Sequence, residues 1–207
     1  MSALKTFWQA IRDVYEELLL FAGVSILWWL GTLLVVPGPP ITAGLYYLTD
    51  RIASEQRVEF SFFWQKAKES IGKGWLVAGI NLAGLIVIVV NFLFYARMNN
   101  LLQYAAIVWT YLFLVWLAMQ LYLFPLLYRM EEPRLGHLLR NSLMLAMARP
   151  GYTALLLVLL ALATVLSTIL PLLLIGFLPA LIAMVGARAT LTVIADVKER
   201  QEEPPAQ

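Results

Sequence analysis

Polar residues within long apolar stretches are the residues of this chain best placed for chemistry. Arg188 is the one charge inside the last apolar stretch, and the amides Asn81, Asn91 and Gln120 lie in two earlier ones. A charge at membrane depth is by default a candidate for function, here binding of an anion or a lipid headgroup. We expect Arg188 instead to reach toward the membrane surface or to pair structurally. The amides are expected to join helices by hydrogen bonds.

Groups suited to catalysis or metal binding are sparse. His137 is the one histidine, cysteine is absent, and Glu131 and Glu132 precede Pro133 as expected of a solvated turn. The sequence lacks the phosphate-binding loop, the zinc-protease helix motif and the serine-hydrolase elbow. We therefore expect no enzyme activity, no cofactor and no metal. The net charge of +2 gives no indication of nucleic-acid binding.

Long uncharged stretches must position these residues. Apolar residues form 61% of the chain, its mean hydropathy is +0.78, and charge is missing from four ranges: Leu18–Val36, Trp75–Ala96, Met98–Tyr128 and Gly151–Ala187. A helix crosses a bilayer core with about 20 apolar residues. The first three ranges fit one span each, and the fourth fits a hairpin of two. The sequence predicts an all-α, polytopic transmembrane bundle with about five full spans.

A proline-rich break follows the first stretch. Pro37, Gly38, Pro39 and Pro40 stop the helix, and the following piece of about 11 residues reaches the next charge at Asp50. We expect this piece to form a short re-entrant or hairpin helix. It must pack against protein, through small residues such as Gly44, with Tyr46 and Tyr47 as anchors.

Amphipathic segments flank the spans. Ser2–Glu17 and Val58–Lys73 each place apolar residues on one helical face and charges on the other, and Arg134–Ala148 is a further candidate. We expect these helices at the membrane surface, with Val58–Lys73 on the cytoplasmic side and the proline-rich break near the far side. Alternatively, the first forms the solvated start of the first span and Val58–Lys73 the solvated foot of the second. Residues 1–197 are expected to form one membrane domain, and 198–207 a polar, disordered tail.

The distribution of positive charge predicts the topology. If the piece after the break returns the chain to its starting side, 14 Lys and Arg lie on one side of the membrane and 1 on the other. If the piece does not return, 12 Lys and Arg lie on one side of the membrane and 3 on the other. Positive residues of short loops favour the cytoplasm. The first model fits better and predicts that both termini are cytoplasmic.

The break also carries a family resemblance. The stretch from Leu34 to Tyr47 resembles the signature of YesL-type bacterial membrane proteins, a family of unknown function, and Pro125–Arg129, Leu138–Leu143 and Ala148–Pro150 continue it in order. The first span departs from the family, because Phe21-Ala22-Gly23 stands where an asparagine is expected. The resemblance implies a bacterial inner-membrane protein with a link to sugar transport, but no catalytic residues.

Two functions remain open on these observations. The first is a non-enzymatic accessory or assembly subunit of a membrane complex, with a carbohydrate transporter as its candidate partner. The alternative is a small transporter or channel in its own right, formed by self-association around the Pro37–Pro40 break. Both require the lipid bilayer.

Overall fold

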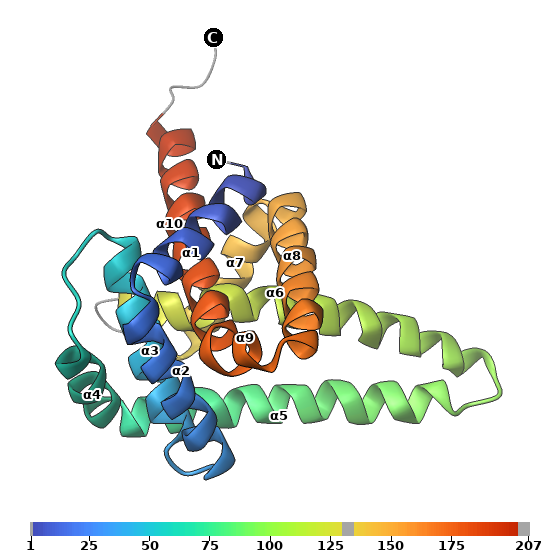
Figure 1. Ribbon diagram of the computed structural model, residues 1–207. Coiled ribbons are helices and arrows are strands. Elements are labelled where there is room, and N and C mark those ends of the chain that lie inside the picture. The colour runs from blue at the N-terminus through green and yellow to red at the C-terminus, as the bar shows by residue number, and fades with distance from the viewer. Residues whose placement is uncertain (1, 130–134, 203–207) are drawn as a thin grey trace.

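The protein is a bundle of helices with one long hairpin that leaves it (Figure 1). The computed structural model describes residues 2–129 and 135–202, and every regular element in this part of the chain is helical. The elements are α1 (Ala3–Glu16), α2 (Leu18–Leu33), α3 (Gly38–Ala53), α4 (Phe60–Glu69), α5 (Ile71–Ala96), the 3₁₀ turn η1 (Leu101–Tyr104), α6 (Ala105–Arg129), α7 (Leu135–Ala148), α8 (Pro150–Ile169), α9 (Pro171–Gly176) and α10 (Leu178–Glu202). The predicted all-α class is confirmed.

In the described part of the chain, four helical segments are long and apolar enough to cross a membrane. They are α5, η1 with α6 up to Leu127, α8 and α10. The pair α1 and α2 gives a fifth if it is taken as one bent span, but its two helices meet at 95°. The count of four or five agrees with the predicted five spans and with the predicted hairpin of α8 and α10, which α9 closes.

The N-terminal amphipathic helix forms as predicted. The Ser2 side chain caps α1 by accepting a hydrogen bond from the Lys5 backbone N–H at 3.4 Å. Ala10 and Val14 are fully buried, and α1 packs mainly against α10 and α8. The helix is therefore part of the bundle, joined to α2 by a sharp bend at Glu17.

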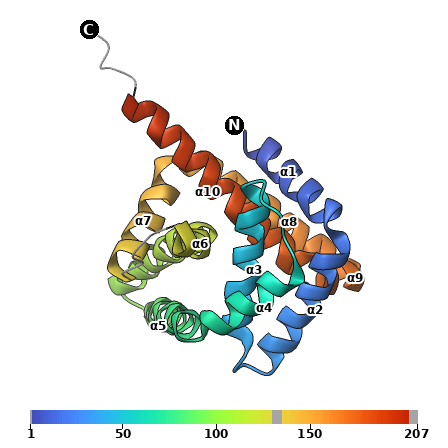
Figure 2. The same cartoon turned by 90° about the vertical axis from the view of Figure 1, so that its left-hand side faces the viewer.

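The proline-rich break lies between two antiparallel helices of equal length. α2 ends at Leu33, and the first prolines of α3 occupy its opening turn, where a missing N–H removes no helical hydrogen bond. α3 has 16 residues, which corrects the expected length of about 11. It returns along α2 and packs against α2, α4, α5, α6 and α10, so this segment lies at the centre of the bundle (Figure 2).

The charged helix α4 runs back along α3 and brings the start of α5 to the break. The Trp75 indole N–H donates to the Val36 carbonyl oxygen at 3.2 Å, and a Cβ placed on Gly74 would lie 3.0 Å from the Pro39 carbonyl. The sequence placed the break near the far side of the membrane and the basic segment before Trp75 at the cytoplasmic side. The structure corrects this expectation, since the two are in contact.

Helices α5 and α6 form an arm that extends well beyond the other helices (Figure 1), and Figure 2 views this arm end-on. In the most apolar 18-residue window of α5 only 6% of residues are buried, and in that of α6 only 17%, against 67% for α10. The base of the arm packs on α3, and η1 lies at its tip. The other helices of the bundle therefore do not cover the outer part of the arm.

The start of α1 and the end of α10 lie at the same end of the bundle (Figure 1). α10 continues to Glu202, so the helix extends beyond residue 197, where the polar tail was expected to begin. The remainder of the expected tail, 203–207, lies outside the described residues, as do Glu131 and Glu132.

Candidate functional site

A groove lies where the arm leaves the bundle, and we call it the arm groove. Its volume is about 420 Å³, and residues of α2, α3, α5 and α6 line it together with Val35 of the α2–α3 turn. The lining consists of Trp28, Thr32, Val35, Gly38, Pro39, Thr42, Ala78, Asn81, Leu82, Leu85, Trp116 and Phe124. The break and the base of the arm thus form one concave surface.

An amide pair joins the two helices of the arm at this groove. The Gln120 side-chain N–H donates to the Asn81 side-chain oxygen at 2.7 Å, which confirms the predicted interhelical hydrogen bond for these two residues. One bond between two amides leaves a second carbonyl oxygen and a second NH₂ group with further capacity. Neither amide makes another side-chain hydrogen bond within the described part of the chain. Asn81, which lines the arm groove, therefore keeps an NH₂ group that can donate, and Gln120 beside it keeps a carbonyl oxygen that can accept.

Aromatic side chains form the other walls of the arm groove. The Trp28 indole N–H donates to the Thr42 hydroxyl oxygen at 2.9 Å, and that hydroxyl donates to the Gly38 carbonyl at 2.9 Å. Phe124 stacks on Tyr46, with ring centres 4.8 Å apart. These contacts fix the rings in place before any ligand or partner binds.

The predicted candidate residues divide between this groove and other places. Gly38, Pro39 and Asn81 line the groove, and Gln120 and Tyr46 contact its lining. Pro37 and Pro40 line a second, smaller groove on the other side of α3. The break and the amides, which the sequence could not connect, are therefore neighbours.

The remaining candidates have local structural roles. Gly44 meets α4, where an added Cβ would lie 2.9 Å from the Phe63 carbonyl oxygen. The Tyr47 hydroxyl accepts a hydrogen bond from Arg51 at 3.2 Å. The Asn91 amide donates at 2.8 Å to the Val87 carbonyl of its own helix, so it does not join helices as predicted.

Arg188 forms an ion pair inside the bundle. Its guanidinium donates to the Asp13 carboxylate at 2.7 Å, and the two side chains are 22% and 12% exposed. Of the two structural roles expected for Arg188, the structure shows pairing, not extension to the membrane surface. The pair lies in a polar cleft of about 570 Å³ between α1, α10 and the α3–α4 loop. In the same cleft Glu16 raises the pKa of Arg12 through a hydrogen bond of 2.6 Å.

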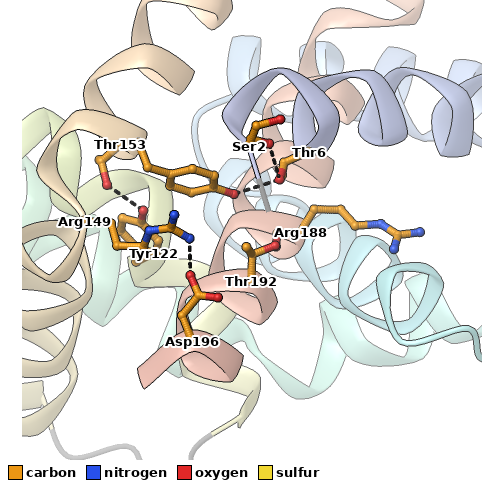
Figure 3. A network of polar contacts seen from close by, with 9 residues as sticks. Ser2, Thr6, Tyr122, Arg149, Thr153, Arg188, Thr192 and Asp196 are labelled. Atoms are coloured by element: carbon orange, nitrogen blue, oxygen red, sulfur yellow. Dashed lines mark hydrogen bonds and ion pairs between the residues drawn. The ribbon is translucent and has the colours of Figure 1, made fainter. Parts of the chain in front are cut away.

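Further polar contacts tie α1, α6, α8 and α10 together. Figure 3 shows Arg149, which lies just before α8, pointing at Asp196 of α10, with which it forms an ion pair. The Tyr152 hydroxyl donates to Thr6 at 2.9 Å, and the hydroxyls of Tyr122 and Thr153 are 2.7 Å apart. Each polar group thereby gains a partner at the point where helices meet.

Sequence reasoning missed these partners. Asp13, Asp50 and Asp196 are ordinary charges near the ends of apolar stretches, and only the fold brings them to Arg188, Arg129 and Arg149. Asp50 pairs with Arg129 at 2.7 Å. No local signal could have assigned these pairs, because the chain has 3 Asp but 10 Arg.

Comparison with models of protein families, with curated proteins and with solved structures gave no match. The YesL-type resemblance therefore stays a prediction. Among the described residues no three His, Asp or Glu side chains are grouped to hold a metal ion.

Proposed function

We propose that this protein is a non-enzymatic accessory or assembly subunit that holds another membrane protein at its arm groove. The observation that supports the proposal is the arm itself, two span-length helices whose outer part stays uncovered, with a groove at its base. Large exposed apolar patches mark surfaces that bind a membrane or a partner protein. The arm groove adds polar groups to that surface.

The amide pair favours a partner helix over lipid chains as the occupant. Asn81 and Gln120 keep one NH₂ group and one carbonyl oxygen for further hydrogen bonds. Acyl chains offer neither donor nor acceptor, whereas a second protein offers both through its side chains or an irregular backbone. Side-chain hydrogen bonds between membrane helices contribute about 1 kcal/mol each.

Close packing at the bundle centre argues against a pore through one copy of the chain. A Cβ on Gly186 of α10 would lie 2.7 Å from the Leu121 carbonyl oxygen, and one on Gly44 would lie 2.9 Å from that of Phe63. Backbones therefore meet directly around α3. The alternative function, a small transporter or channel, requires a second copy to complete the path.

The membrane and the partner follow from the sequence. The family resemblance names a bacterial inner membrane and a carbohydrate transporter as the first partner to test. The charge distribution supports an orientation with both termini in the cytoplasm.

Purification from the native membrane in mild detergent tests this function. We expect a second membrane protein to co-purify with the tagged chain, and the double variant Asn81→Leu and Gln120→Leu to retain several-fold less of it. Asn91→Leu is the matched control, because this amide bonds only to its own helix. It should retain the partner fully.

Native mass spectrometry separates the outcomes. A complex with a second polypeptide supports the accessory role. Assemblies that contain this chain alone support the self-associating alternative. Equal partner retention in the double variant and in Asn91→Leu would show that the arm groove is not the binding surface.

A further inference from the structure

A second groove lies on the opposite side of α3 from the arm groove, and we call it the α3–α4 groove. Its volume is about 270 Å³, and it is lined by apolar side chains of the α2–α3 turn, α3, α4 and the start of α5. Pro37 and Ile41 lie on one wall, and Trp64, Ile71 and Trp75 on the other. Its size and apolar lining suit a segment of hydrocarbon chain.

Two tryptophans give this groove a fixed shape. Trp75 is held by its 3.2 Å hydrogen bond to the Val36 carbonyl, and Trp64 packs on Phe63 with ring centres 6.2 Å apart. Both indoles remain partly exposed, at 40% and 45%. Partly exposed tryptophans are typical of the level where lipid headgroups meet acyl chains.

Lys68 is the only charged residue that lines the α3–α4 groove. Its ammonium lies 5.8 Å from the centre of the Trp64 ring, and no ion pair joins it to a carboxylate within the described residues. An apolar groove with one positive group beside it matches a molecule that has a hydrocarbon chain and a negative head.

The charge pattern places this groove at the edge of the bilayer. Lys66, Lys68 and Lys73 precede Trp75, and the next charge after Lys73 is Arg97, at the tip of the arm. The headgroup region therefore lies near Lys73. Lysines just outside a span attract anionic lipids by about 1 kcal/mol each.

We propose that the α3–α4 groove is a binding site for one anionic phospholipid. The acyl chain lies between Ile41 and the two tryptophans, and the headgroup phosphate pairs with the Lys68 ammonium. The lipid would brace the α2–α3 turn against α4 and α5. This site is independent of the arm groove and of the function proposed for it.

Lipid quenching in vesicles tests the site with the full chain. Because the chain has no cysteine, a single Leu76→Cys can carry a fluorophore beside the groove, next to Trp75 but outside the lining. Phosphatidylglycerol with a spin-labelled chain should reach half-maximal quenching at a mole fraction about five-fold lower than spin-labelled phosphatidylcholine. The same label at Leu172→Cys, an 85% exposed position of α9, should show no headgroup preference.

Charge variants give the deciding comparison. In the Leu76→Cys background, Lys68→Gln should reduce the preference to about one-fold, Lys68→Arg should keep it, and Lys198→Gln at the far end of α10 should leave it unchanged. Equal quenching by both lipids in the parent would overturn the proposal. An undiminished preference in Lys68→Gln would also overturn it, since the attraction would then come from the surrounding lysines.

Discussion

Small residues determine how closely the central helices of this bundle approach one another. Gly44, Gly74 and Gly186 each lie where a Cβ would stand 3.0 Å or less from a backbone oxygen of another helix or of the break. Such contacts leave no room for a methyl group. Polar residues also hold helices together, since the ion pair of Asp13 and Arg188 joins the first helix of the chain to the last.

Gly44→Ala should lower stability, because the new methyl group would lie 2.9 Å from the Phe63 carbonyl oxygen. Overpacking of this kind costs about 1–3 kcal/mol. Gly79→Ala is the matched control, since nothing lies within 4 Å of its added Cβ, and higher helix propensity should raise stability by up to about 1 kcal/mol. Unfolding in detergent measures both variants. Equal effects would show that Gly44 does not set the distance between α3 and α4.

Arg188→Met should lower the free energy of unfolding by about 3 kcal/mol, because it leaves the Asp13 carboxylate largely buried without its partner. The double variant Asp13→Leu and Arg188→Met should recover much of this loss. Arg12→Met is the control, since Arg12 and Glu16 pair at the surface with 72% and 54% exposed side chains. Its effect should be much smaller than that of Arg188→Met, because solvent screens a surface ion pair. If the loss of stability in the double variant equals the sum of the losses in the two single variants, Asp13 and Arg188 are not coupled.

At the scale of elements, the turn between α2 and α3 carries backbone strain. Val35 has a φ of 64°, a left-handed conformation that is rare for a β-branched residue. The turn needs it because α3 must reverse direction within four residues of the end of α2. The turn therefore borders two grooves, the arm groove on one side and the α3–α4 groove on the other.

Val35→Gly should raise the free energy of unfolding by about 1 kcal/mol, since glycine adopts a positive φ without the Cβ penalty. The side chain is 63% exposed, so little packing is lost. The neighbouring Leu34 has a φ of −78°, and Leu34→Gly should instead lower stability. Chemical unfolding in detergent compares the two variants. A loss in Val35→Gly as large as in Leu34→Gly would mean that the turn stores no strain.

Most of the elements could be predicted from the sequence, because charge-free stretches and helical spacing are local signals. The break at Pro37 was visible, but the length of α3 was not, since prolines in an opening turn start a helix as readily as they end one. Of the candidate site, Asn81 and Gln120 were each predicted to hydrogen-bond between helices, but neither their pairing with each other nor the contact of Trp75 with Val36 was predicted. Long-range partners depend on how helices cross, which local patterns do not encode.

At the scale of the whole molecule, the fold limits how deep the α2–α3 turn can lie in a membrane. Trp75 bonds to Val36, so the turn and the start of α5 lie at the same depth. The charge of Lys73, two residues before Trp75, keeps this point near a membrane surface. We therefore predict that the α2–α3 turn lies near one membrane surface and that the arm of α5 and α6 crosses the bilayer.

Cysteine labelling in intact cells tests this topology, since the parent chain has no cysteine that interferes. Cysteines at Ser2 and Leu34 should react only after the cytoplasmic side is opened, because both lie at the surface that carries most of the positive charge. A cysteine at Asn99, at the tip of the arm, should react from the outside. If Leu34→Cys reacts together with Asn99→Cys, then α2 crosses the whole membrane. If Asn99→Cys reacts together with Ser2→Cys, the arm does not cross, and the apolar surface of α5 and α6 must be covered by another protein.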